Sequence, residues 1–124
     1  ELDRNSADYA ERLSRQSKLR DRVLQILNEH DLDALFFPHQ QRLVVPIGAR
    51  QVERNGALAS VTGFPAIALP GGFSPPTAGA PLGVPVGVEL LGRPWDEGRL
   101  IGLAYGIEQI LRCRVAPASV PPLH

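Results

Sequence analysis

The chain has 124 residues, of which 44% are apolar and 21% are charged, and this length suits one domain with a modest core. Its thirteen basic and thirteen acidic side chains cancel, so no net field draws the chain to nucleic acid or to a membrane surface, and we expect neither as a partner. Cys113 is the only cysteine, which excludes an internal disulfide and a zinc site built on several thiolates.

The same features bear on the compartment. A lone cysteine fits a reducing environment, and no apolar run reaches the roughly 20 residues needed to cross a bilayer. Residues 1–5 lack the basic start and apolar stretch of a signal peptide, so any targeting signal would lie upstream of this sequence. We therefore expect a cytoplasmic location.

The first predicted element is an amphipathic helix over residues 6–29. Ser6 or Asn5 can accept hydrogen bonds from the free N–H groups at its start. The charged residues of this segment are interspersed in sign, which is typical of a solvated helix face. Five large residues recur at three- and four-residue steps and form a stripe that we expect to face the core: Tyr9, Leu13, Val23, Leu24 and Leu27.

A short apolar strand over residues 35–37 is expected next, and it ends at Pro38. A run that is apolar throughout is typical of a central strand covered on both faces. Residues 38–50 show no periodicity, and a connection of this length is often functional. A second, short helix is predicted over residues 51–61, with Gly63 placed to terminate it.

Two further strands follow. Residues 66–69 form the first, which we expect to end in a tight turn at residues 70–72 because proline and two glycines stand there. Residues 84–91 form the second, in which apolar and other residues alternate. Glu89 interrupts its apolar character, and the nearby Pro85 favours an edge position where this carboxylate would face solvent.

The last helix has a clear start. Asp96 is a good N-cap, and Trp95 can pack on Leu100 as a hydrophobic staple. A continuous helical stripe then runs to Leu111. The proline-rich residues 117–124 are expected to form an extended tail.

The predicted order is therefore helix, strand, helix, strand, strand, helix. This order indicates the α/β class, with a mixed β-sheet of at least three strands covered by helices. Because no repeat and no domain boundary is visible, residues 1–124 are predicted to form a single domain.

No catalytic set can be assigned from the residues. None of the six serines lies in a Gly-x-Ser-x-Gly elbow. Lys18 is the only lysine, and Ser14 is its neighbour one helical turn earlier. Both are expected on a solvated face, where nothing would lower the basicity of the amine for catalysis.

The histidines offer one weak candidate. His30, His39 and His124 have no compact ligand spacing and no cysteine joins them, so we expect no metal and no cofactor. His39 lies in the unpatterned loop after a strand, where functional residues are common. A solvated histidine is the simpler interpretation of that position.

Several segments, taken together, resemble the C-terminal region of the amidase signature family of serine hydrolases. They are residues 32–38, 55–67, 85–94, 96–100 and 108–109. The likeness extends over roughly residues 7–124. It implies that the chain is the C-terminal part of the family's α/β/α sandwich.

The resemblance also implies amide hydrolysis by a serine, a cis-serine and a lysine, none of which has a counterpart in this sequence. No catalytic residue is therefore assigned. What the resemblance implies for this region is part of the substrate-pocket wall. In transamidating members, an acidic residue shortly before the segment that corresponds to residues 55–67 holds the substrate's ammonium. Glu53 lies near that position in this sequence. The loop that begins at His39 is the other candidate. Glu53 and His39 are thus the candidate pocket residues.

Three interpretations remain open at this point. The first is the C-terminal portion of an amidase that is inactive alone and handles a small amide substrate only in the complete enzyme. The second is a free-standing scaffold that associates with itself, and the third is a complementing subunit of a split amidase. The expected partner is accordingly either a second copy or a catalytic N-terminal part.

Overall fold

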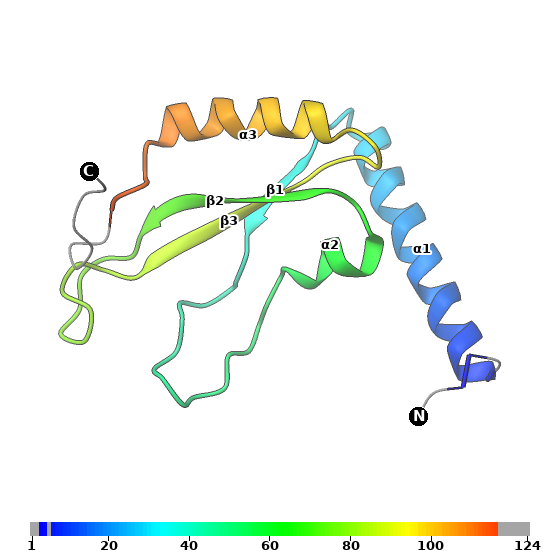
Figure 1. Ribbon diagram of the computed structural model, residues 1–124, viewed down its shortest axis with the longest axis horizontal. Helices are drawn as coiled ribbons and strands as arrows, with labels where there is room; N and C mark the ends of the chain where they lie inside the picture. Colours follow the sequence, from blue (N-terminus) through cyan, green and yellow to red (C-terminus); the bar gives the residue numbers. More distant parts are fainter. Residues whose placement is uncertain (1–2, 5, 117–124) are drawn as a thin grey trace, which may run out of the picture.

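The computed structural model describes residues 3–4 and 6–116 of the chain. The predicted element order is confirmed (Figure 1). The elements are α1 (Ala7–Glu29), β1 (Leu35–Pro38), α2 (Ala57–Thr62), β2 (Ala66–Phe73), β3 (Pro85–Leu91) and α3 (Glu97–Leu111). The tail predicted at residues 117–124 lies outside the described residues.

The strands form one three-stranded sheet in the order β1-β3-β2. A mixed sheet was predicted, and in the described part of the chain both strand pairs are antiparallel. The prediction that β1 is the central strand is wrong, because it lies at an edge and Phe36 is 52% exposed. An apolar run does not reveal how many neighbours a strand has, and here β3 takes the centre.

The central position of β3 also overturns the prediction for Glu89. This residue pairs with Phe37 on one side and Ala68 on the other, so it does not lie at a sheet edge. Its exposed fraction is 4%. A carboxylate in such a place needs a hydrogen-bonding partner.

A β-bulge replaces the turn predicted at residues 70–72. β2 continues to Phe73, and its register against β3 shifts between Pro70 and Gly72. A Cβ built on Gly71 would fall 2.7 Å from Cγ1 of Val88, so only glycine allows this close approach of the two strands. The chain reverses only after the bulge, where the backbone N–H of Ser74 donates to the carbonyl of Val84 at 2.9 Å.

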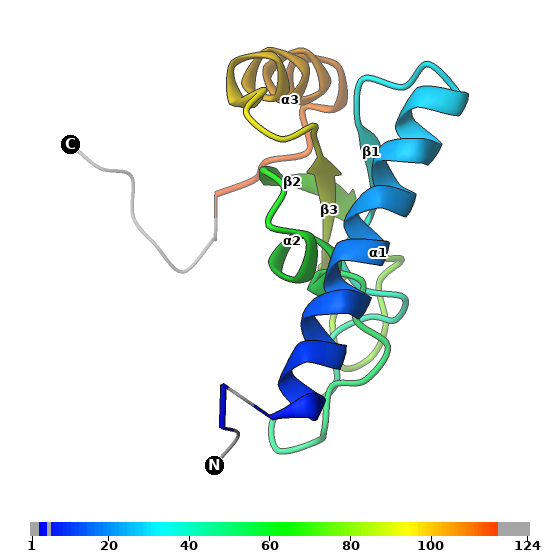
Figure 2. The same cartoon turned by 90° about the vertical axis from the view of Figure 1, so that its right-hand side faces the viewer.

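Helix α3 covers one face of the sheet. Figure 1 shows it lying along β2 and β3, and Figure 2 shows it on the opposite side of the sheet from α2. Leu100 and Ala104 of α3 pack with Leu90 of β3, and Ile67 and Leu69 of β2 border this cluster. The stripe predicted for the last helix therefore faces the sheet as far as Ile107, whereas Ile110 and Leu111 at its end are exposed.

Helices α1 and α2 cover the other face at one end only. Leu91 of β3 is fully buried there against Val23 and Leu27 of α1, together with Phe64. The first half of α1 extends past the sheet (Figure 2), and Leu13, which was predicted to face the core, is half exposed. Farther along this face, the loop between β1 and α2 takes the place of a helix (Figure 1).

Arg93 joins the end of β3 to the end of α1. Its guanidinium donates to the carbonyls of Leu27 and Leu32, at 3.1 and 3.0 Å, and to Oδ1 of Asn28 at 2.6 Å. The carbonyl of Leu27 lies in the last turn of α1, where it also accepts from the N–H of Leu32 at 2.8 Å, and Leu32 lies in the turn after the helix. A cation at this end also complements the helix dipole.

The helix starts agree only in part with the predictions. Ser6 caps α1, accepting from the backbone N–H of Tyr9 at 3.2 Å. Asp96 precedes α3 but its side chain makes no capping hydrogen bond. Trp95 is 93% exposed, so the predicted staple on Leu100 does not form. Helix α2 is shorter than predicted, and Gly63 ends it in the left-handed conformation as expected.

Candidate functional site

Two residues that lie 50 positions apart meet on the face of the sheet that α3 leaves free. Nδ1 of His39 is 2.8 Å from Oε2 of Glu89. His39 directly follows β1, and its backbone N–H donates to the carbonyl of Gly87 at 3.1 Å, which extends the pairing of β1 with β3 by one residue. The register of the two strands thus brings the imidazole to the carboxylate. His39 is a half-exposed loop histidine, as the simpler interpretation expected, and it also has a buried partner in Glu89.

The two partners differ in burial. The side chain of Glu89 is 5% exposed and that of His39 is 44% exposed. Oε1 of Glu89 is buried and has no hydrogen-bond partner within the described part of the chain, a condition that typically costs about 1–3 kcal/mol for a polar group and more for a charged one. The pair therefore consists of a buried carboxylate, which accepts the hydrogen bond, and an imidazole that is partly exposed to solvent.

Residues at the start of α2 hold the imidazole in place. A Cβ built on Gly56 would fall 2.8 Å from Nε2 and 2.9 Å from Nδ1 of His39, so the ring lies against the Gly56 backbone. The backbone N–H of Asn55 donates to the carbonyl of His39 at 3.0 Å. The side-chain amide of Asn55 donates to the carbonyl of Pro38 at 2.8 Å. Gln41 donates to Oδ1 of Asn55 at 2.9 Å. These contacts fix the loop on which His39 stands.

The chemistry of the pair follows from its donors and acceptors. An ionised carboxylate only accepts hydrogen bonds, so Nδ1 of a neutral His39 carries the proton and its N–H donates a hydrogen bond to Glu89. Nε2 of that tautomer has a free lone pair. The arrangement can accept a hydrogen bond from a bound molecule, or a proton from a reacting group.

Glu53, the other predicted pocket residue, lies on the same loop. Its carboxylate forms an ion pair with Arg42. Its backbone carbonyl accepts from the N–H of Gln41 at 2.9 Å, next to an isolated bridge between Gln40 and Arg54. Glu53 and His39 thus stand on paired segments, and neither is shown in contact with a ligand. Their role as pocket residues stays a prediction.

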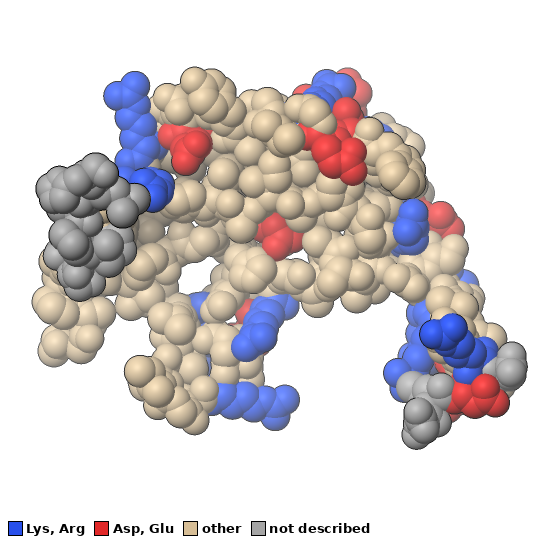
Figure 3. Space-filling model, in the orientation of Figure 1, with Lys and Arg blue, Asp and Glu red and all other residues tan. Residues whose placement is uncertain are grey.

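An open hollow of about 500 Å³ lies between this loop and the sheet. One wall is formed by Ala68 of β2 and by residues 85–87 of β3. The other is formed by residues 38–44, which include His39. Figure 3 shows the uncharged surface that covers much of this side of the molecule, with basic side chains on the loop and on the first half of α1.

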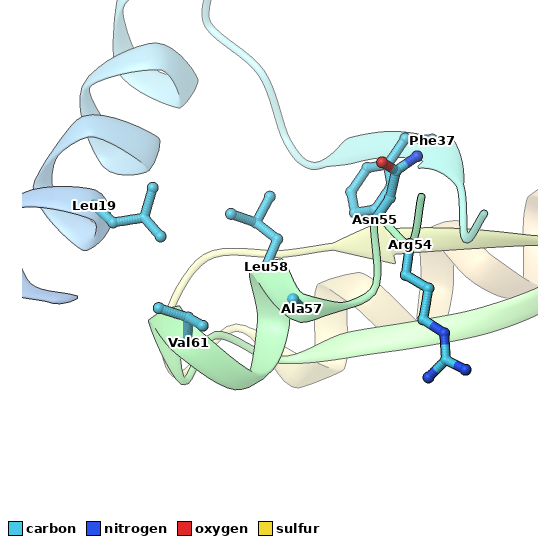
Figure 4. A pocket seen from close by; sticks show the side chains of 7 residues that line it. All are labelled: Leu19, Phe37, Arg54, Asn55, Ala57, Leu58 and Val61. Atoms are coloured by element: carbon cyan, nitrogen blue, oxygen red, sulfur yellow. The ribbon is translucent and has the colours of Figure 1, made fainter. Parts of the chain in front are cut away.

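A second groove lies between α1, α2 and β1. Figure 4 shows Leu19 of α1 facing Leu58 and Val61 of α2, with Phe37 and Asn55 at its far end. The lining is mostly apolar, and it contains no histidine, serine or acidic residue. This groove is suited to packing against another apolar surface.

Other candidates from the sequence are not brought together. Ser14 and Lys18 lie on the exposed side of α1. Within residues 3–4 and 6–116, no group of three or more His, Cys, Asp and Glu side chains could hold a metal ion. No helix in these same ranges combines the length and hydropathy needed to cross a membrane.

Sequence reasoning missed the partnership of His39 with Glu89 and the role of Gly56. One signal was present: an acidic residue stands within a strand that is otherwise rich in valine and leucine. Such a residue indicates a buried partner as readily as an edge position. Which partner it has depends on strand register, which this signal does not contain.

Comparisons with known proteins agree on one family. Mandelamide hydrolase from Pseudomonas putida is 36% identical over an alignment of 95 residues, which covers 69% of this chain and 18% of that protein. Fatty acid amide hydrolase from Arabidopsis thaliana is 37% identical over 60 residues, covering 48% of this chain and 9% of the relative. The solved structure of peptide amidase from Stenotrophomonas maltophilia superposes with a TM-score of 0.67 and 30% identity, covering 85% of this chain and 21% of that one.

The homologues of this chain are members of the amidase signature family. The α/β class is confirmed by the same structural likeness to an amidase signature fold. No family model matches the sequence. The chain spans about a fifth of the solved amidase and 9–18% of the two hydrolases named above.

Proposed function

We propose that this chain acts as the C-terminal part of an amide hydrolase. In this role it supplies sheet strands, covering helices and one wall of the substrate site, while the nucleophile comes from elsewhere in the enzyme. The observation that carries the proposal is the likeness to peptide amidase over 85% of this chain but only 21% of that one. Similarity to mandelamide hydrolase over 95 residues supports the same reaction class.

The arrangement of the serines supports the view that the chain alone is inactive. In the described ranges, no serine hydroxyl is hydrogen-bonded to a lysine or histidine side chain. Those of Ser6, Ser60 and Ser74 bond to backbone groups. A serine needs an adjacent base to become a nucleophile at neutral pH. We therefore propose that residues 1–124 by themselves do not hydrolyse amides.

A fluorophosphonate probe tests this directly, because it labels only activated serines. The purified chain should remain unlabelled under conditions in which intact peptide amidase from Stenotrophomonas maltophilia, used as the positive control, is labelled fully. Stoichiometric labelling that disappears when one serine is changed to alanine would overturn the proposal.

We also propose that the chain associates with a catalytic N-terminal part, which would be either the rest of the same polypeptide or a separate subunit. β1 and β2 are the two edge strands of the sheet described here, and unpaired edges are usually covered in native proteins. The apolar groove in Figure 4 lies beside β1 and offers further surface to cover. A small amide would then be hydrolysed only in the complete enzyme.

Exposed apolar side chains favour a second candidate, a scaffold that associates with its own copies. The large exposed residues include Phe36, Ile47, Trp95, Tyr105 and Ile110. Exposed apolar patches commonly mark an interaction surface. Sedimentation of the purified chain over a range of concentrations should reveal a dimer or larger species, and a monomer at all concentrations would contradict this candidate.

The expected cytoplasmic location belongs to the same proposal. It is supported by the single cysteine, which suits a reducing compartment. Fractionation of cells that carry the complete gene should place the protein with cytoplasmic markers, and recovery in a secreted or organellar fraction would contradict it.

A further inference from the structure

We propose that Glu89 holds His39 as a hydrogen-bond acceptor for the N–H group of a carboxylic amide that binds in the hollow between residues 38–44 and the sheet. The choice of an amide as ligand rests on the proposed function. The orientation of the imidazole rests only on geometry, and the two are tested separately below.

Glu89 fixes the direction of the His39 imidazole. Nδ1 is held by Oε2 of Glu89 at 2.8 Å, and no partner is found for Nε2 among the described residues. Because the carboxylate can only accept, it selects the tautomer in which Nε2 is the acceptor. His39 is half exposed and lines the hollow, so a ligand there can reach the ring.

The burial of Glu89 supports an orienting role. Removing a carboxylate from water is costly, and well-packed apolar residues, such as the neighbouring Leu90 and Leu91, often replace buried ion pairs without loss of stability. Among the described residues, its Oε1 atom is also buried without a partner. Burying the Glu89 carboxylate therefore costs free energy that packing alone does not explain. The need to orient His39 explains it.

The lining of the hollow favours an uncharged ligand. Arg42, which lines the hollow, forms an ion pair with Glu53. The carboxylate of Glu89 is buried and bonded to His39, and it is not among the described groups that line the hollow. Ala68, Pro85 and Val86 contribute apolar surface beside the ring. A neutral molecule with an N–H group and an apolar substituent fits this lining better than an ion does.

Nitrogen-15 NMR of the 124-residue chain tests both parts. Spectra are recorded at about pH 8, where an ordinary histidine is neutral. The His39 ring should show the tautomer with the proton on Nδ1. Addition of benzamide should shift the Nε2 resonance, whereas N,N-dimethylbenzamide, which has the same ring but no N–H, should leave it in place. His30, exposed at the end of α1, provides a reference in the same spectrum.

The variant E89Q provides a matched change of polarity. A glutamine of the same shape can offer either its amide N–H or its oxygen to Nδ1, so the exclusive preference for the Nδ1–H tautomer is removed. The benzamide shift should then be reduced. The proposal is overturned if wild-type His39 carries its proton on Nε2, if benzamide leaves its resonance unchanged, or if both amides shift it equally. The wild-type measurements decide the matter even if E89Q does not fold.

These outcomes are separate from the test of the proposed function. A fluorophosphonate-labelled serine in this chain would refute that function while leaving the tautomer of His39 as measured. Conversely, a chain that stays unlabelled and does not respond to benzamide would retain the proposed function and refute the inference.

Discussion

The imidazole ring of His39 lies against the backbone of Gly56, with no room for a side chain between them. A Cβ on residue 56 would approach Nε2 to 2.8 Å and Nδ1 to 2.9 Å, well inside normal contact. Gly56 has ordinary helical dihedral angles, so glycine is required here for space and not for conformation. The first residue before α2 thereby controls whether the imidazole can reach Glu89.

Replacing Gly56 by alanine should therefore displace the ring. We expect a loss of about 1–3 kcal/mol in the free energy of unfolding, as is usual for overpacking. The Nδ1–H tautomer of His39 should be lost at the same time, because the ring can no longer lie against the backbone. Urea denaturation and nitrogen-15 NMR measure the two effects.

Gly79→Ala is the control for this change, since a Cβ at that position meets nothing within 4 Å. Its effect should remain within about 0.5 kcal/mol. A Gly56→Ala protein with unchanged stability and an unchanged His39 spectrum would show that the ring does not occupy the position described.

The second prediction concerns Arg93, which donates three hydrogen bonds to the end of α1 and the turn after it. Arg93→Met keeps much of the aliphatic side chain and removes all three donors. We expect destabilisation of about 2 kcal/mol, because the carbonyl of Leu32 and Oδ1 of Asn28 lose this donor, while the carbonyl of Leu27 keeps only the bond from the N–H of Leu32. Thermal and urea unfolding measure the change.

Arg99→Met provides the comparison for that prediction. Arg99 pairs with Asp33, and both side chains are at least half exposed. Exposed ion pairs contribute about 0–1 kcal/mol, so this change should matter much less. Equal losses for the two variants would mean that Arg93 acts as an ordinary surface cation.

A third prediction separates the covered and uncovered parts of the sheet. Leu91, at the end of β3, is fully buried against α1 and Phe64. Leu91→Ala should therefore lower the free energy of unfolding by about 2–5 kcal/mol. Phe36 is on the edge strand β1 and is half exposed. Full burial of such a side chain contributes about 1.5–3 kcal/mol, so Phe36→Ala should lower the free energy of unfolding by less than about 1.5 kcal/mol. Urea denaturation of dilute protein measures both.

The Phe36 variant also informs on association. If a second copy or a catalytic part covers β1, Phe36→Ala should weaken that complex more than it weakens the fold, which sedimentation can measure. A large loss of stability in the dilute chain would instead mean that Phe36 is buried by the chain itself.

The fourth prediction compares two glycines in or beside helices. Gly63 ends α2 with φ of 68°, so Gly63→Ala should destabilise the chain by about 1 kcal/mol. Gly102 lies within α3, and a Cβ there meets nothing within 4 Å. Gly102→Ala should stabilise the chain by up to about 1 kcal/mol. The opposite signs, read from paired denaturation curves, test the two helix assignments; equal signs would contradict them.

The helices could be predicted well because their signals are local. The polar cap at Ser6, the stripe through Val23 and Leu27, and the left-handed Gly63 each depend on residues within a few positions of one another. The exceptions are local as well. Trp95 and Asp96 carry a staple and capping pattern that the turn geometry does not use, since Trp95 has φ of 65° and points to solvent.

The amino-acid sequence by itself determined the order of the elements, the two long helices and the likeness to amidases, because these depend on short-range patterns of side chains. Only the tertiary structure decided that β3 is central and that His39 meets Glu89 across 50 positions. The physical reason is strand register. Which residues of two strands face each other is set by how the whole sheet packs against α1, α2 and α3, and no residue of either strand carries that information alone.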